Sequence, residues 1–144
     1  MSDYDTDILL WSERQGELLR RRAAGELVND TQLDWPNIAE EIDSVGREQL
    51  HAVQSLLRQS ITHRLKVIAW PQSSAVEGWQ DEDLRFRQDA MDRYTPAMRQ
   101  RIDLARIYSR ALQRRLPRQI DGLAPQPVPS TCPWTLDELL SDEP

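Results

Sequence analysis

Glu48 and His51 stand three residues apart, the spacing of the Glu-x-x-His pair that a helix contributes to a carboxylate-bridged di-metal site. A complete site of that kind needs a second such pair and two further glutamates. His63 is the other histidine of the chain, and Ser60 rather than an acid stands three residues before it. The ligand set is therefore incomplete. We expect no metal, and a solvated helix face at Glu48 and His51.

Four other polar residues are candidates for a binding or catalytic site: Glu40, Glu41, His63 and Asp83. Glu40 and His63 are 23 residues apart in one expected helix, which is about 34 Å if that helix is straight. They meet only through a bend or across an antiparallel dimer. The alternative is structural, since carboxylates stabilise a helix N-terminus and a histidine can hydrogen bond to a neighbouring element.

Arginines form the third candidate, and they are segregated from the acids. Residues 96–118 hold seven arginines and one acid, whereas residues 30–46 hold five acids and no basic residue. A stripe of such residues suits a phosphate backbone, but only Tyr108 lies nearby as a stacking partner, and the chain has a net charge of −6. We therefore favour a solvated or ion-pairing face, paired with the acidic stretch, over nucleic-acid binding. The stripe consists of Arg99, Arg106, Arg110 and Arg114.

Four helices are expected to position these residues, over about 6–24, 36–69, 74–94 and 96–116. Pro36 is tolerated in a first turn, and Pro71 stops the helix that it opens. Ser74-x-x-Glu77 is a capping box, and Thr95-Pro96 reads as an N-cap followed by the first helical residue. The residues expected in the core are Trp11, Leu56, Trp79 and Phe86.

The C-terminal third predicts a different kind of structure. Residues 122–133 contain four prolines, too many for a helix or a central strand, so they are expected to be extended. Thr135-x-x-Glu138 is another capping box, which opens a short helix over 135–141. The sequence thus predicts an all-α fold in one domain over 1–144: a bundle of four main helices, a Pro-rich connection and a short C-terminal helix.

The expected helix over 36–69 carries two successive apolar stripes and is longer than any helix available to cover it. Either it bends near Gly46, where a helix interior is weakest, or a second subunit covers the excess. The second possibility predicts a homodimer, with the acidic end of this helix meeting the arginines at the rim of the interface. The residues expected on the shared surface are Leu50, Leu57, Ile61 and Leu65.

Several motifs together carry a family resemblance. They are LDWPNIAEEIDSVG over residues 33–46, Tyr4-Asp5-x-Asp7 followed by Trp11, His63-x-Leu65-Lys66 followed by Trp70, and Cys132-Pro133-Trp134-Thr135 near the end. With these motifs the chain resembles, over nearly its whole length, the bacterial family catalogued as domain of unknown function 29. The resemblance implies a compact, all-helical bacterial protein, and it assigns no catalytic residue and no activity.

Composition narrows the class of protein further. Cys132 is the only cysteine, so no intramolecular disulfide is possible, and nothing argues for an oxidising compartment. The N-terminus is acidic, and no apolar run approaches the roughly 20 residues that span a bilayer. We expect a cytoplasmic protein.

Three functions remain open. The preferred one is a non-catalytic helical module that binds another protein, without a cofactor. The alternative is an enzyme or small-ligand-binding bundle that uses the acidic and histidine residues of the second and third helices. The third is nucleic-acid binding through the arginine stripe. The sequence contains no Gly-rich phosphate loop, zinc pattern or nucleophile elbow, so an enzyme has the weaker support.

Overall fold

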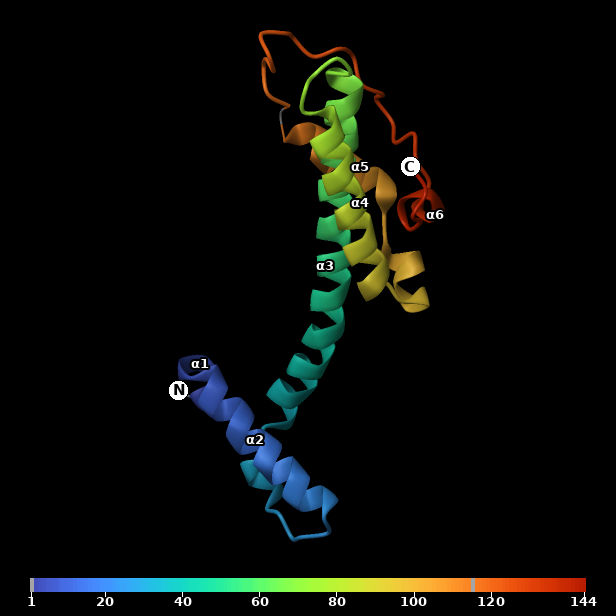
Figure 1. The fold of residues 1–144 in the computed structure, drawn as a ribbon. Helices are drawn as coiled ribbons and strands as arrows, with labels where there is room; N and C mark the ends of the chain where they lie inside the picture. Colours follow the sequence, from blue (N-terminus) through green and yellow to red (C-terminus); the bar gives the residue numbers. More distant parts are fainter. Residues whose placement is uncertain (1, 115) are drawn as a thin grey trace. The chain divides into compact units, whose positions relative to one another are not determined.

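A computed structural model describes residues 2–114 and 116–144 of the chain (Figure 1). The described residues form helices, and no strand occurs among them, so the all-α prediction is confirmed. By contacts, the chain divides into two compact units, Met1–Arg47 and Glu48–Pro144. The single domain expected over 1–144 stays a prediction. The long helix α3 (Trp35–Ala69) contributes to both units, and it is helical through Gly46. Among the described helices, none has the length and apolar character needed to cross a bilayer.

The first unit contains α1 (Asp3–Thr6), α2 (Ile8–Ala23), the 3₁₀ helix η1 (Asp30–Gln32) and the first part of α3. The side chain of Asp7 caps α2 by accepting a hydrogen bond from the Leu10 amide at 3.0 Å. Gly25 then ends the helix with φ of 85°, a conformation that glycine adopts without strain. The small core of this unit consists of Trp11, Leu33 and Ile38.

One carboxylate ties the first unit together. Asp34 accepts hydrogen bonds from the Trp11 indole at 2.9 Å and from the Asn37 amide at 2.8 Å. The Asn37 bond is the larger cause of a lowered pKa of Asp34, and the Trp11 bond adds to it. The side chain of Gln15 in turn accepts from the Asp34 backbone amide at 2.9 Å. These contacts join α2 to the beginning of α3.

The second unit contains the rest of α3 together with α4 (Val76–Arg93), η2 (Pro96–Arg101), α5 (Leu104–Gln113) and α6 (Leu136–Leu139). Figure 1 shows α4 beside the C-terminal part of α3. Apolar residues of α3, α4, α5 and α6 share one core. Its fully buried members include Val53, Leu57, Ile61, Leu65, Ala90 and Leu139.

The helix predicted over 96–116 is wrong as a single helix. The chain forms η2 over Pro96–Arg101 and then a separate helix, α5, over Leu104–Gln113. The side chain of Asp103 explains the break, because it accepts from the Arg106 amide at 3.1 Å and so starts a new helix. Within the predicted range, residue 115 lies outside the described residues, and Leu116 is not helical. The start of the preceding helix also differs, since α4 begins at Val76 and its N-cap residue makes no side-chain capping bond.

The residues expected on a shared surface between two subunits are placed differently. Leu57, Ile61 and Leu65 are fully buried in the core of the second unit, and Leu50 packs against it half-buried. Residues of α4, α5 and α6 from the same chain cover this stripe, so the predicted interface is wrong for these residues. A homodimer stays a prediction. Of the four residues expected in the core, Trp11 is buried, whereas Leu56, Trp79 and Phe86 are half-buried.

The Pro-rich segment over 122–133 forms no helix, and it closes the end of α3. The Trp70 indole donates to the carbonyl of Leu123 at 2.8 Å, and the Gln126 amide donates to the carbonyl of Ala69 at 2.8 Å. The hydroxyl of Tyr108 donates to the carbonyl of Pro129. Helix α6 follows, and Thr135 caps it by accepting from the Glu138 amide at 3.1 Å.

Candidate functional site

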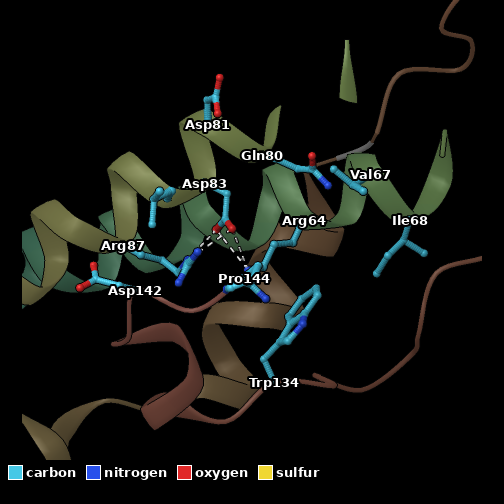
Figure 2. Close-up of a pocket in the computed structure, with 11 residues that line it drawn as sticks. Arg64, Val67, Ile68, Gln80, Asp81, Asp83, Arg87, Trp134, Asp142 and Pro144 are labelled. Carbon is cyan, nitrogen blue, oxygen red and sulfur yellow. Dashed lines mark hydrogen bonds and ion pairs between the residues drawn. The ribbon is translucent and has the colours of Figure 1, made fainter. Parts of the chain in front are cut away.

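A cavity of about 610 Å³ lies in the second unit, bounded by α3, α4 and the C-terminal segment (Figure 2). Such a volume lies within the range of small-molecule sites in proteins. Figure 2 shows Asp83 at its centre, between Arg87 and Arg64, with Trp134 on the opposite side of Arg64. The remaining lining residues are Val67, Ile68, Gln80, Asp81, Leu84, Asp142 and Pro144.

Helical spacing explains the central cluster. Ser60 and Arg64 are four residues apart on one face of α3, and Asp83 and Arg87 are four residues apart on the facing side of α4. The Ser60 hydroxyl donates to Asp83, and the Nε atoms of Arg64 and Arg87 donate to both of its oxygens at 3.1 Å and 3.3 Å. The carboxylate is buried, and both of its oxygens accept from guanidinium groups. Asp83 is thus the acceptor of an ion-pair network.

Arg87 extends this network to the end of the chain. Its side chain is only 2% exposed, and its Nη1 atom donates to the carbonyl of Glu143 at 2.7 Å and to that of Ser141. A buried charge is tolerated only when it is paired and hydrogen bonded, and Arg87 meets both conditions. The cluster therefore connects α3, α4 and the C-terminal segment.

Arg64 forms one wall of the cavity. Its guanidinium lies over the ring of Trp134, 5.2 Å from the centroid, which is a cation–π contact. Val67, Ile68 and Leu84 add apolar surface, and Gln80, Asp81 and Asp142 are polar residues of the lining. The arrangement suits recognition of a small molecule that has an apolar body and polar substituents.

The other candidates from the sequence lie elsewhere. In the first unit, Glu40 pairs with Arg47 at 2.5 Å, and Glu41 accepts from the Tyr4 hydroxyl at 2.7 Å. That hydrogen bond, with burial and the charge of Glu41, raises the pKa of Tyr4 to about 12. Glu40 and Glu41 are therefore engaged within their own unit.

His63 lies on α3 in the second unit, where it contacts α4. Its Nδ1 is 2.8 Å from the carbonyl of Gln59, its Nε2 is 2.5 Å from the carboxylate of Glu82, and its ring lies against Phe86. Each ring nitrogen thus has a partner, as expected for a histidine with a structural role. Of the four candidates only Asp83 lines the cavity, so the structure does not bring them together.

Glu48 and His51 are both exposed. Within residues 2–114 and 116–144, no three side chains of histidine, cysteine, aspartate or glutamate gather as metal ligands. Cys132 is half-buried, and burial raises the pKa of its thiol. Its sulfur donates to the carbonyl of Trp134 at 3.4 Å, a structural contact beside the cavity.

The arginine stripe does not act as one surface. Arg99 pairs with Asp137 at 2.6 Å, whereas Arg106 and Arg110 line a separate hollow of about 450 Å³. The acidic stretch expected to meet these arginines pairs within its own unit instead, through Asp30 with Arg22 and Glu40 with Arg47.

Sequence reasoning missed Arg64, Arg87 and Trp134 as cavity residues. The spacing of Asp83 and Arg87 is a readable i, i+4 ion-pair pattern. The contribution of Trp134 carries no such signal, because a residue of the C-terminal segment reaches α3 only through the tertiary fold.

Comparison with known proteins gives a family and a fold. The family model described as Domain of unknown function DUF29 matches residues 4–143. Among solved structures, the chain is similar to an alpha-helical protein of unknown function from Rhodospirillum rubrum. The two share 25% sequence identity with a TM-score of 0.66, over 99% of this chain and 92% of the other. None of the curated proteins matches.

Proposed function

The chain belongs to the DUF29 family, and from that premise we propose that it is a non-catalytic helical module that binds another protein through its first unit. The observation that carries the proposal is an apolar face on the first part of α3 that is exposed except at Ile38. This face is called the α3 seam below, and it consists of Trp35, Ile38, Ile42 and Val45.

The seam has the spacing of a helix–helix contact. Its residues follow one another at intervals of three, four and three, so they share one side of the helix. Ile38 is buried in the core of the first unit, but Ile42 is 68% exposed and Val45 is 64% exposed. The seam thus continues beyond the residues that the first unit covers.

Exposed apolar side chains concentrate in this unit. Six of the seven large apolar residues that are exposed in the described part of the chain lie before residue 48: Ile8, Leu9, Leu27, Trp35, Ile42 and Val45. Single exposed apolar residues are ordinary on a protein surface, whereas neighbouring ones on one helix face mark an interaction site.

The fitting partner element is an amphipathic helix. A seam with alternating spacings of three and four residues accepts the apolar side chains of a second helix between its own. Exposed Asp43 and the ion pair of Glu40 with Arg47 supply polar groups beside the seam, as at the rim of many interfaces. A second copy of the chain meets this requirement, and the predicted homodimer is therefore assigned to the seam rather than to the buried leucines.

The first test is the mass of the protein by light scattering at micromolar concentration. We expect a dimer for the native chain and a monomer for the double variant Ile42→Glu with Val45→Glu, because charged side chains on the seam would be desolvated in the complex. Leu27→Glu is the matched control, since Leu27 is fully exposed in the same unit but lies outside the seam.

If the native chain is a monomer, pull-down from the source organism with the same three proteins tests a different partner. A protein retained by the native chain and by Leu27→Glu, and lost with the double variant, supports the module. The proposal fails if the double variant matches the native chain in both mass and retained proteins.

The second candidate function is small-ligand binding, which the cavity beside Asp83 favours by its volume and by the pairing of Arg64 with Trp134. Thermal-shift screening of the native chain against Leu84→Trp, which narrows the cavity, tests this function. A compound that stabilises both proteins equally binds elsewhere.

A further inference from the structure

Four arginines gather around one hollow of about 450 Å³ in the second unit. It is a different site from the cavity beside Asp83 and lies outside the α3 seam. We call it the arginine hollow, and its basic residues are Arg58, Arg101, Arg106 and Arg110.

The elements of the second unit hold these arginines in place. Arg58 follows Gln54 by one turn of α3. The side-chain amide of Gln54 donates to the carbonyl of Arg101, at the end of η2, at 3.5 Å. Arg106 and Arg110 are four residues apart on α5, so they lie on one face of that helix. The adjacent face of α5 carries Ile107 and Ala111 into the core, which fixes the side of α5 that meets the hollow.

The positive charge of the hollow is not neutralised. Eight other arginines in the described part of the chain form an ion pair with a carboxylate, but none of these four does. Asp103 is the one acid that lines the hollow, and its carboxylate caps α5 by accepting from the Arg106 amide. An acidic chain, with a net charge of −6, thus concentrates unpaired guanidinium groups in one place.

We propose that the arginine hollow binds the clustered phosphate groups of a small ligand, of the diphosphate or triphosphate class. A guanidinium donates two parallel hydrogen bonds to a phosphate, and several guanidiniums together match a group that carries several negative charges on few atoms. Among the described residues of the lining, Leu50 is the one large apolar side chain, beside His51, Gln54 and Ser55, so the site suits a hydrophilic ligand.

The same chemistry in a nucleic acid fits this surface less well. Binding to single strands combines a basic track with aromatic side chains on which bases stack. Tyr108 is the aromatic residue between Arg106 and Arg110 in the sequence, but it is buried, and its hydroxyl donates to the carbonyl of Pro129. The hollow therefore offers phosphate contacts without a stacking surface from α5.

Isothermal titration calorimetry with inorganic pyrophosphate, at low ionic strength, tests the proposal. The test variant is Arg106→Gln with Arg110→Gln, and the control is Arg85→Gln with Arg93→Gln, two arginines of α4 outside the hollow. Both variants lose two positive charges. We expect the dissociation constant to rise about tenfold or more in the test variant, the loss of hydrogen bonds to a charged group, and to change less than about twofold in the control.

Circular dichroism and thermal midpoints check that each variant folds, and the single variant Arg110→Gln replaces the double one if it does not. The proposal is overturned if the native chain binds no pyrophosphate, or if both double variants weaken binding equally. It is also overturned if a single-stranded oligonucleotide binds more tightly than pyrophosphate and loses affinity equally in both, because that result marks a diffuse electrostatic surface.

Discussion

Asp83 joins two guanidinium groups that come from different helices, Arg64 of α3 and Arg87 of α4. Removing the carboxylate leaves Arg87, which is almost completely buried, without its counter-charge. We expect Asp83→Ala to lower the free energy of unfolding by about 3–5 kcal/mol, the usual effect of breaking a buried pair. Denaturant unfolding measures it. Exposed Asp81→Ala is the control, within about 0.5 kcal/mol of the native chain, and equal stability of the two variants would refute this role.

The pair of Tyr4 and Glu41 predicts a titration in the first unit. The pKa of Tyr4 is raised from 10.0 to about 12, mainly by its hydrogen bond to Glu41. A raised pKa means that this contribution to stability is complete below pH 10.0 and is lost as the pH rises through the folded value. Ultraviolet difference titration of Glu41→Gln should show one tyrosine ionising at lower pH than in the native chain. An unchanged titration curve would contradict the assignment.

Among single residues, the sequence identified Asp83 as an unusual polar residue but did not identify its partners. The spacing of Asp83 and Arg87 is visible in the sequence, because both lie on one helix. Arg64 and the carbonyl of Glu143 come from elements far away along the chain, so only the tertiary fold brings them together. For Glu40 and Glu41 the sequence left two roles open, in a site or in stabilising a helix N-terminus. Both side chains bind partners in their own unit.

Helix α3 carries buried and exposed apolar residues, and truncating the two kinds is expected to affect the free energy of unfolding differently. Leu57 is fully buried among residues of α3, α4 and α5, whereas Ile42 is exposed. We expect Leu57→Ala to lower the free energy of unfolding by about 2–5 kcal/mol, since it leaves a cavity. Ile42→Ala should change it by no more than about 0.5 kcal/mol at protein concentrations too low for the chain to dimerise through the α3 seam. Thermal or denaturant unfolding compares the two, and similar losses would show that Ile42 is covered.

The ends of α3 were predictable from local chemistry. Pro36 and Pro71 gave an expected range of 36–69, and the helix spans Trp35–Ala69. The break before α5 was missed because Asp103 offers the backbone a side-chain acceptor that periodicity does not register. Periodicity also shows which residues are buried without showing what buries them. For this reason the stripe of Leu57, Ile61 and Leu65 was assigned to a second subunit.

For the whole molecule, the helical class and the family were both predictable. The motifs that carry the family resemblance extend from Tyr4 to Thr135, and the matched range is 4–143. The segregation of acids and arginines was also predictable, but the pairing expected between the acidic stretch and the arginine stripe was not found among the described residues. Acids of this stretch form ion pairs within their own unit, as Asp30 does with Arg22, and the arginines of the hollow form none in the part of the chain that the structure describes. Counting charges along the sequence shows that acids and arginines are separated. Which of them form ion pairs depends on which side chains the fold brings within reach.

The C-terminal segment is held by hydrogen bonds to residues of α3 and α4. The Gln126 amide donates to the last carbonyl of α3, that of Ala69, and Arg87 donates to the carbonyls of Ser141 and Glu143. A helix end has carbonyls that lack intrahelical partners, so the segment acts as a cap supplied from far along the chain.

We expect this arrangement to set an order of assembly. The Ala69 carbonyl lies at the end of α3 only once that helix has formed, so we expect the segment to dock after the helix and to open before it. Native-state hydrogen exchange should show the Gln126 amide protected, yet opening at a lower free energy than the amide of Leu57 in the core. Equal opening free energies would mean that the segment and the helices unfold as one cooperative unit.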